Sequence, residues 1–480
     1  MKATVVVEHR NCHQYPGEKY GYAPSVKYPE YCWEDIASER NEVYDMVRDA
    51  LHLYGLDQAH YDTSAWNPLG DIIKHGDTVL IKPNWVMHYN ENSSGGLDCL
   101  FTNTSVTRAM IDYVSLALKG SGKIYVADSA MPDCNFDQFV KVAHLDILKR
   151  SCEERGIQIE IKDLRGDIVK TFSKERIITT EAKGTEVDLG RDSYFVGLKH
   201  PKNSLRYSFL DAKKMNEYYH TDAHHRYVIS DIALAADVII NLPKIKTHRK
   251  AGYTAALKNY IGICFRKDAI PHFVKGNKVQ GGDEFYGPKV VFQTESNIRD
   301  KENYFENKQN RTAGLALKAL RIPFWLFRRA FATKYQGVGN WHGNDTIWRA
   351  VLDINKIIYY ADKKGVLRDI VQRRFFSLGD MIIAGERNGP LSPSPKQCGC
   401  IVCSENPVAF DKVVLKLMGF EQSRVPLFMG IRKEKKYCLC VENDDNICVL
   451  KNGILQNLSD VEMISQKAFQ PADGWKNILK

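Results

Sequence analysis

The sequence lacks the signals that define several large classes of protein. No run approaches the about 20 consecutive apolar residues that span a bilayer, and the early apolar run in MKATVVVEHR meets a charge at Glu8, too soon for a secretory signal. It also contains no phosphate-loop motif, dinucleotide-binding glycine fingerprint or nucleophile elbow. We therefore expect a cytoplasmic protein, and ATP hydrolysis, simple NAD chemistry and serine hydrolysis gain no support.

The sequence also lacks a closely spaced cysteine run of the ferredoxin kind, although it has 12 cysteines. Cys398 and Cys400 would face one side of a strand and Cys403 the other, so the three do not easily reach one ion. Scattered cysteines in a chain without a secretory signal are typical of reduced, buried thiols. A metal or iron–sulfur redox protein is kept as an alternative.

Composition indicates a soluble globular protein of two or three domains. The chain has 480 residues, of which 44% are hydrophobic and 26% charged. Its formal net charge of +9 is modest for this length. Such a charge fits a small acidic or phosphorylated substrate, or a membrane surface, better than nucleic acid.

Alternating strand and helix patterns predict an α/β fold. We expect a mostly parallel, Rossmann-like central sheet with flanking helices, built from discontinuous segments, with irregular insertions and a small strand-rich C-terminal tail. The expected segments are an N-terminal strand and helix extension, the first half of the core, an irregular insertion, the second half of the core and the tail, at residues 1–70, 71–265, 266–342, 343–425 and 426–480.

A basic cluster follows the most regular predicted strand, Val238–Ile240. Turn-like residues with Lys244, Lys246 and His248 come next, and then a helix-forming segment, 254–263, that carries Lys258 and Asn259. A second predicted strand, 77–81, ends at Lys82 and Asn84. Ligands bind at the carboxyl ends of parallel strands, so these groups are expected to converge there.

Clustered ammonium groups lower one another's pKa and attract carboxylate or phosphate. We expect Lys258 to act as base or nucleophile, because it has apolar helix neighbours, and His248 to transfer protons or ligate a metal. The expected substrate-binding residues are Lys82, Asn84, Lys244, Lys246 and Asn259.

Carboxylates at other strand ends form a second candidate group. Asp128 and Asp380 close strand-like runs, and Glu386 lies in a following loop. Opposite a lysine cluster they could hold a divalent cation or act as proton-transfer partners. No specific cofactor is indicated.

Residues 315–335, LALKALRIPFWLFRRAFATKY, combine apolar and basic side chains without an acid. This composition is typical of a helix or hairpin that rests on anionic lipid, at the inner face of the membrane, and also of a core-packing segment with a basic rim.

Four stretches carry a resemblance to a known family: LPKIKTH with ALKNYIGI, LIKPNW at 80–85, GNDTIWRAVLDIN at 343–355 and GDMIIAGERNGPL at 379–391. Together they resemble the bacterial and archaeal domain of unknown function 362 (DUF362) family, whose membership implies no particular reaction.

A fainter similarity is to the lactate racemase family. Its nickel-pincer domain has a His, a Gly-Tyr or Gly-Phe pair and a Lys at spacings similar to those of His248, Gly252, Tyr253 and Lys258. That family continues with Ser-Gly-Gly, where residues 254–256 here are Thr-Ala-Ala.

Taken together, the sequence predicts an enzyme that acts on a small anionic substrate, a hydroxy acid or a sugar acid or phosphate, by proton-transfer or transferase-like chemistry. Surface-polysaccharide assembly is a setting that would suit the aromatic loops and the basic amphipathic stretch. The alternatives are a non-catalytic accessory protein of a membrane-associated biosynthetic complex and the metal or iron–sulfur redox protein.

Overall fold

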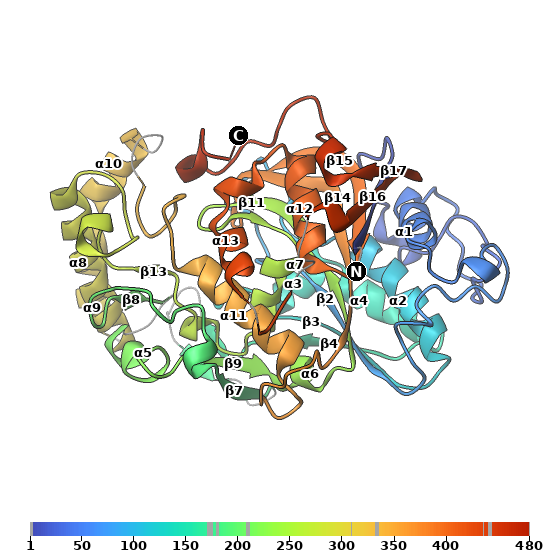
Figure 1. Ribbon diagram of the computed structural model, residues 1–480, viewed down its shortest axis with the longest axis horizontal. Coiled ribbons are helices and arrows are strands. Elements are labelled where there is room, and N and C mark those ends of the chain that lie inside the picture. Colours follow the sequence, from blue (N-terminus) through green and yellow to red (C-terminus); the bar gives the residue numbers. More distant parts are fainter. Residues whose placement is uncertain are drawn as a thin grey trace.

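The computed structural model describes residues 3–169, 176–178, 182–207, 212–308, 310–331, 336–434, 436–439 and 444–479. Its centre is a large sheet (Figure 1). From edge to edge the main path runs β17 (Ile454–Asn457), β16 (Ile447–Lys451), β1 (Ala3–His9), β15 (Ser392–Ser404), β14 (Arg374–Asn388), β10 (Val238–Leu242), β2 (Thr78–Pro83), β3 (Lys123–Asp128) and β4 (Ile159–Asp163).

The strand pairs at the heart of this sheet are parallel. They are β14–β10, β10–β2, β2–β3 and β3–β4, and β1 also pairs with β16 in parallel. Antiparallel pairing is found where β15 joins β14 and β1, and at the β16–β17 edge. The predicted α/β fold with a mostly parallel sheet is confirmed.

Both faces of the sheet are buried, which explains the continuous apolar run in β10. Val238, Ile240 and Leu242 belong to one hydrophobic core and Ile239 to the other. Successive side chains of a strand point to opposite faces, so a strand between two helical layers is apolar throughout.

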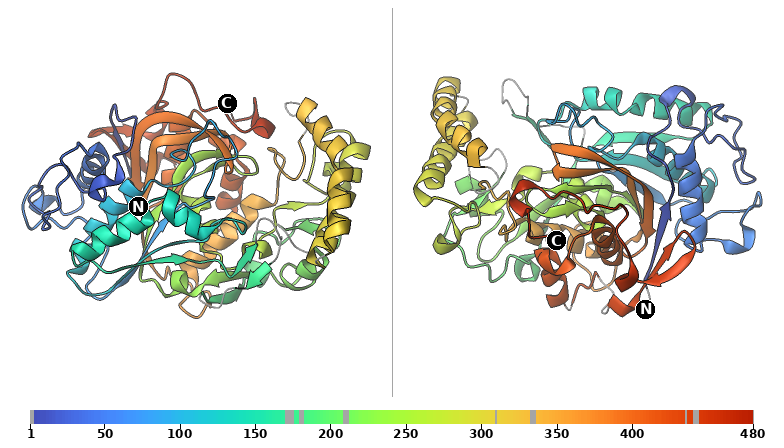
Figure 2. Two further views of the ribbon diagram at one scale, coloured as in Figure 1. Left: turned by 180° about the vertical axis from the view of Figure 1, so that it is seen from behind. Right: turned by 90° about the horizontal axis from the view of Figure 1, so that it is seen from above.

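Each core is closed by its own set of helices (Figure 2). One layer has α1 (Glu42–Leu53), α2 (Thr104–Leu118), α3 (Phe136–Val142) and α4 (Leu145–Glu154). The other has α6 (Asp231–Ala235), α7 (Ala256–Asn259), α11 (Ile347–Tyr360), α12 (Pro407–Met418) and α13 (Pro426–Lys433).

The basic stretch after β10 is more regular than predicted. Residues expected to form a loop form β11 (Lys244–His248), which pairs with β14 and with β12 (Gly252–Thr254). The predicted helix 254–263 is reduced to α7 followed by a 3-10 turn, Tyr260–Ile263. The long β14 offers backbone partners beyond the end of β10, and this tertiary pairing overrides the local turn signals.

The segment predicted as an irregular insertion contains helices. α8 (Lys289–Asn307), α9 (Arg311–Leu320) and α10 (Ile322–Phe331) stand to one side of the sheet (yellow in Figures 1 and 2). Two short strands, β8 (Leu205–Arg206) and β13 (Phe273–Val274), pair at their base. None of the helices in the described ranges combines the length and apolar character that crossing a bilayer requires.

Candidate functional site

A cavity of about 430 Å³ lies between the sheet and α8. Asn84, Trp85 and Val86, which follow β2, line it together with Asp128 at the end of β3. β11, β12 and α7 provide another wall, and Arg299 and Asp300 of α8 the opposite one. The cavity thus occupies the carboxyl ends of parallel strands, where open α/β sheets bind ligands.

Four lysines line this cavity: Lys246, Lys250, Lys258 and Lys267. The Nζ of Lys246 donates to Asn84 Oδ1 (2.7 Å) and to the Leu100 carbonyl. Lys267 donates to the carbonyls of Ser129 and Ala130, and Lys250 to that of Val338. None of the four forms an ion pair with a carboxylate within the described part of the chain. We call this space the lysine cavity after these four residues.

Lys258 is distinguished because no described group accepts a hydrogen bond from its ammonium. Burial, together with the charges of Lys267 and Lys82, lowers its pKa to about 7. Burial and the charge of Lys258 likewise hold the pKa of Lys246 well below its usual value. Near neutral pH a substantial fraction of Lys258 is therefore a free amine that can take up a proton or attack a carbonyl.

A buried carboxylate positions the short helix that carries Lys258. Asp411 Oδ1 accepts hydrogen bonds from the Ala256 amide (2.7 Å) and the Leu257 amide (3.4 Å), at the first turn of α7. Its Oδ2 accepts from the Tyr253 hydroxyl (2.7 Å). Asp411 thus satisfies the amides that a helix start leaves without partners.

His248 is held in one protonation state by its backbone surroundings. Its Nδ1 accepts hydrogen bonds from the amides of Lys250 and Ala251, both at 3.1 Å. An imidazolium would turn an N–H toward these donors, so the ring is neutral with its hydrogen on Nε2. Burial and the charge of Lys258 lower its pKa in the same direction. His248 therefore offers the N–H of Nε2 as a donor to the cavity. Its Nδ1 lone pair is already used by the two backbone amides and is not free to bind a metal.

Within the described part of the chain, three buried polar atoms of the lining residues have no hydrogen-bond partner: Thr254 Oγ1, Asn259 Oδ1 and the Tyr207 hydroxyl. The amide nitrogen of Asn259 is already used, since it donates to Asn241 Oδ1 (2.8 Å) and the Lys82 carbonyl (3.3 Å). Buried polar groups are normally hydrogen-bonded, so these three atoms are exceptions beside the cavity.

Two of the predicted substrate-binding lysines lie outside the cavity lining. Lys82 Nζ is fully buried and pairs with Asp128 Oδ1 (2.7 Å), packed so closely beneath Gly262 that a side chain there would collide with both groups. Lys244 Nζ pairs with Asp380 Oδ2 (3.0 Å) and donates to the Tyr15 hydroxyl (2.7 Å). Because a buried carboxylate already neutralises each lysine, neither is offered to a ligand.

The structure does not bring the three predicted metal carboxylates together. Asp128 and Asp380 belong to the ion pairs above, and Glu386 accepts from the Gln470 amide (2.9 Å). Among the described residues no group of three His, Cys, Asp or Glu is placed to hold a metal. Cys398, Cys400 and Cys403 are buried free thiols, as predicted.

The cavity gathers Asn84, Lys246, His248, Lys258 and Asn259 from the predicted site, with Asp128 at its edge. Residues 206, 207, 267 and 299 were missed. Lys267 stands close behind the recognised stretch and could have been found by extending the search for basic residues. Arg299 comes from the segment predicted as an irregular insertion, and Arg206 and Tyr207 from the part of the chain before β9 (Arg226–Ser230). No local signal shows that these residues face the sheet.

Comparison with known proteins gives one match. Residues 197–416 match the family model described as domain of unknown function (DUF362). This segment contains β11, α7 and most of the lysine cavity. Searches of curated proteins and of solved structures found no match, so the similarity to lactate racemases stays a prediction.

Proposed function

The chain belongs to the DUF362 family through residues 197–416, and we propose from its lysine cavity that it is an enzyme acting on a small anionic molecule. The substrate class is a hydroxy acid or a sugar acid, bound through its carboxylate or phosphate. The reaction class is proton transfer at a carbon next to a carboxylate or carbonyl.

One observation carries this proposal: Lys258 lines a cavity with three other lysines and has no partner within the described residues. The carboxylates of the lining are already engaged, since Asp128 pairs with Lys82, Glu284 with Arg299 and Asp300 with Arg206. Lys258 is half-buried, and a charge that is partly withdrawn from water without a partner is costly. A bound anion supplies the missing counter-charge.

The geometry divides the roles among the cavity residues. Lys246 and Lys267 attract the anionic group, while the free amine of Lys258 takes a proton from the neighbouring carbon and returns it. The Nε2–H of His248 donates to the oxygen on which negative charge develops. We propose this donor role for His248 in place of proton transfer, because its Nδ1 hydrogen bonds disfavour the charged form that a proton carrier needs.

Hydrogen exchange tests the proposal. Lactate, malate, glucuronate and galacturonate are incubated with the protein in deuterium oxide, and loss of the proton signal next to the carboxylate or carbonyl is followed by NMR. We expect exchange on at least one acid and a reduction of about 100-fold or more in Lys258→Met. The control is Lys149→Met on α4, whose side chain is half-exposed.

Two outcomes would overturn the enzyme proposal. One is wild-type exchange in Lys258→Met, and the other is an absence of exchange on all four acids. Ligand-induced thermal stabilisation without exchange would instead favour the non-catalytic accessory protein. Surface-polysaccharide assembly is the setting we propose, because sugar acids are its building blocks.

We also propose peripheral membrane contact through α9 and α10. Leu315, Leu320, Ile322 and Leu326 are exposed there, and Arg311 and Arg329 are basic neighbours without a carboxylate partner in the described structure. Lys318 and Arg321, in contrast, pair with Glu306 and Glu302 of α8. Sedimentation with phosphatidylglycerol vesicles is expected for the wild type and weakened in Leu320→Glu/Leu326→Glu; equal sedimentation would exclude this contact.

A further inference from the structure

A second cavity, of about 420 Å³, adjoins the lysine cavity. Five arginines line it, with Trp325 beside them: Arg249, Arg299, Arg321, Arg328 and Arg329. Arg249, Arg299, Val338 and Asn340 line both cavities. The second space, which we call the arginine groove, therefore shares a wall with the lysine cavity.

The groove holds more positive charge than its carboxylates neutralise. Arg299, Arg321 and Arg328 share one buried carboxylate, Glu295, at 3.1, 3.8 and 3.1 Å. Arg321 also pairs with Glu302 and Arg299 with Glu284, whereas among the described residues Arg328 pairs with Glu295 alone.

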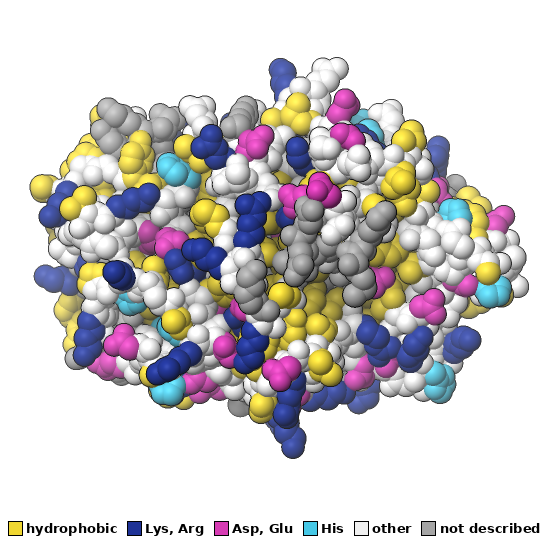
Figure 3. All heavy atoms as spheres, viewed as in Figure 1, with side chains coloured by type: hydrophobic (Ala, Val, Ile, Leu, Met, Phe, Trp, Pro, Cys, Tyr) yellow, Lys and Arg dark blue, Asp and Glu magenta, His cyan; other side chains and the backbone are white. Residues whose placement is uncertain are grey.

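Two further arginines add to this excess. The Arg329 guanidinium lies over the Trp325 ring, 5.4 Å from its centroid, and Arg249 has one long contact with Glu91 (3.5 Å). The acid on the wall, Asp473, is paired with Lys476 (2.8 Å). Basic side chains are spread over the face above α8–α10 in Figure 3.

The two cavities differ in the kind of base they present. Lysines have a pKa that burial can lower toward neutrality, which suits proton transfer, whereas an arginine stays charged. The planar guanidinium binds phosphate oxygens in pairs, so arginines are favoured where phosphate is recognised.

We propose that the arginine groove binds a phosphate or diphosphate group of the same molecule whose acidic end enters the lysine cavity. The substrate class is then a phosphate-linked sugar acid. The assignment of the acidic end rests on the proposed function, but the phosphate site in the groove does not.

Calorimetric titration with three probes tests this inference: inorganic pyrophosphate, glucuronate and UDP-glucuronate, which joins both groups. We expect UDP-glucuronate to bind more tightly than either separate group, because the second contact becomes intramolecular. In Arg328→Gln/Arg329→Gln we expect about 10-fold or weaker binding of pyrophosphate and UDP-glucuronate, with glucuronate unchanged. Arg311→Gln on α9, outside the groove, is the matched control.

Lys258→Met separates the two proposals, because it should weaken glucuronate and leave pyrophosphate unchanged. Pyrophosphate that fails to bind the wild type, or binds the arginine variant as tightly as the wild type, would overturn the groove as a phosphate site. If glucuronate alone fails to bind, the proposed function is at fault and the groove stands. Unchanged thermal midpoints would show that the variants are folded.

Discussion

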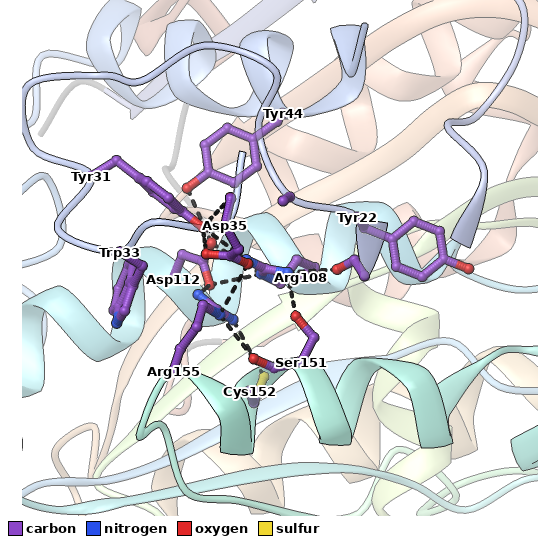
Figure 4. Close-up of polar contacts among 12 residues, drawn as sticks. Tyr22, Tyr31, Trp33, Asp35, Tyr44, Arg108, Asp112, Ser151, Cys152 and Arg155 are labelled. Atoms are coloured by element: carbon purple, nitrogen blue, oxygen red, sulfur yellow. Dashed lines mark hydrogen bonds and ion pairs between the residues drawn. The ribbon is translucent and has the colours of Figure 1, made fainter. Parts of the chain in front are cut away.

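Two regions of the molecule bury clusters of basic side chains, and they differ in how the charge is matched. Beneath the N-terminal loop, Arg108 and Arg155 are enclosed with two carboxylates (Figure 4). Arg108 donates to Asp112 (3.0 Å) and Asp35 (2.7 Å), and Arg155 to Asp112 (2.7 Å). In the lysine cavity no lysine has such a partner within the described chain.

The pKa values follow this difference. Burial by itself would lower the pKa of Arg108, but Asp112 and Asp35 together keep it above its usual value. At Lys258 burial and neighbouring lysines act in the same direction and lower the pKa to about 7. A cluster of basic side chains that is paired with carboxylates stabilises the fold. A cluster without carboxylate partners, placed at strand ends, has the charge that a binding site for an anion requires.

The largest effect on stability is expected when the ion-pair cluster of Arg108 and Arg155 loses one of its carboxylates. Asp112→Asn leaves Arg108 and Arg155 buried with too little negative charge, and we expect a loss of about 3–5 kcal/mol in the free energy of unfolding. Urea denaturation measures it. Glu153→Gln, on the exposed side of α4, should stay within about 0.5 kcal/mol. A loss below about 1 kcal/mol in Asp112→Asn would show that the cluster contributes little to stability.

The same contrast between paired and unpaired basic groups can be tested at two neighbouring lysines, Lys82 and Lys258. Lys82→Met leaves Asp128 buried without its ion-pair partner, and we expect a loss of about 3 kcal/mol. Lys258→Met removes a charge that has no partner, so stability should be unchanged or higher. Urea titrations of the two variants, made without ligand, measure the difference, and equal losses would contradict the assignment of one lysine to the fold and the other to ligand binding.

Sequence patterns predict the frame of this site because its strands are locally encoded. β2, β3 and β10 are buried apolar runs, and their parallel order brings the residues that follow them to one rim. Lys246, His248 and Lys258 converge there for that reason. In the structure, helices α2 and α12 each begin at an Asn cap, Asn103 and Asn406, whose side chains accept hydrogen bonds from first-turn amides.

Which lysine is neutralised could not be predicted, because ion pairing joins distant parts of the chain. Lys82 meets Asp128 46 residues away, and Lys244 meets Asp380 136 residues away. Residues 315–335 contain no acid, yet Lys318, Arg321 and Arg328 are paired with the acids of α8. Local composition therefore overstates the free positive charge of this segment.

A smaller effect is expected in the pH dependence of stability. The folded pKa of Lys258, about 7, is below the value of about 10.4 in an unfolded chain. Between these values the unfolded state binds more protons, so this residue's contribution rises with pH. From pH 7 to 8.5 the wild type should gain stability relative to Lys258→Met, by at most about 1.4 kcal/mol per pH unit. A constant difference between the two proteins would place the lysine in water with an ordinary pKa.

The smallest expected change is in the protonation state of His248. This basic group is kept neutral by backbone amides, with no carboxylate of the described residues involved. Two backbone amides occupy its Nδ1, so protonation would require breaking both hydrogen bonds. In ¹⁵N-resolved spectra its ring should remain the Nε2–H tautomer from pH 8 to pH 5.5. An imidazolium signal for His248 near pH 6.5 would return it to the role of proton carrier beside Lys258.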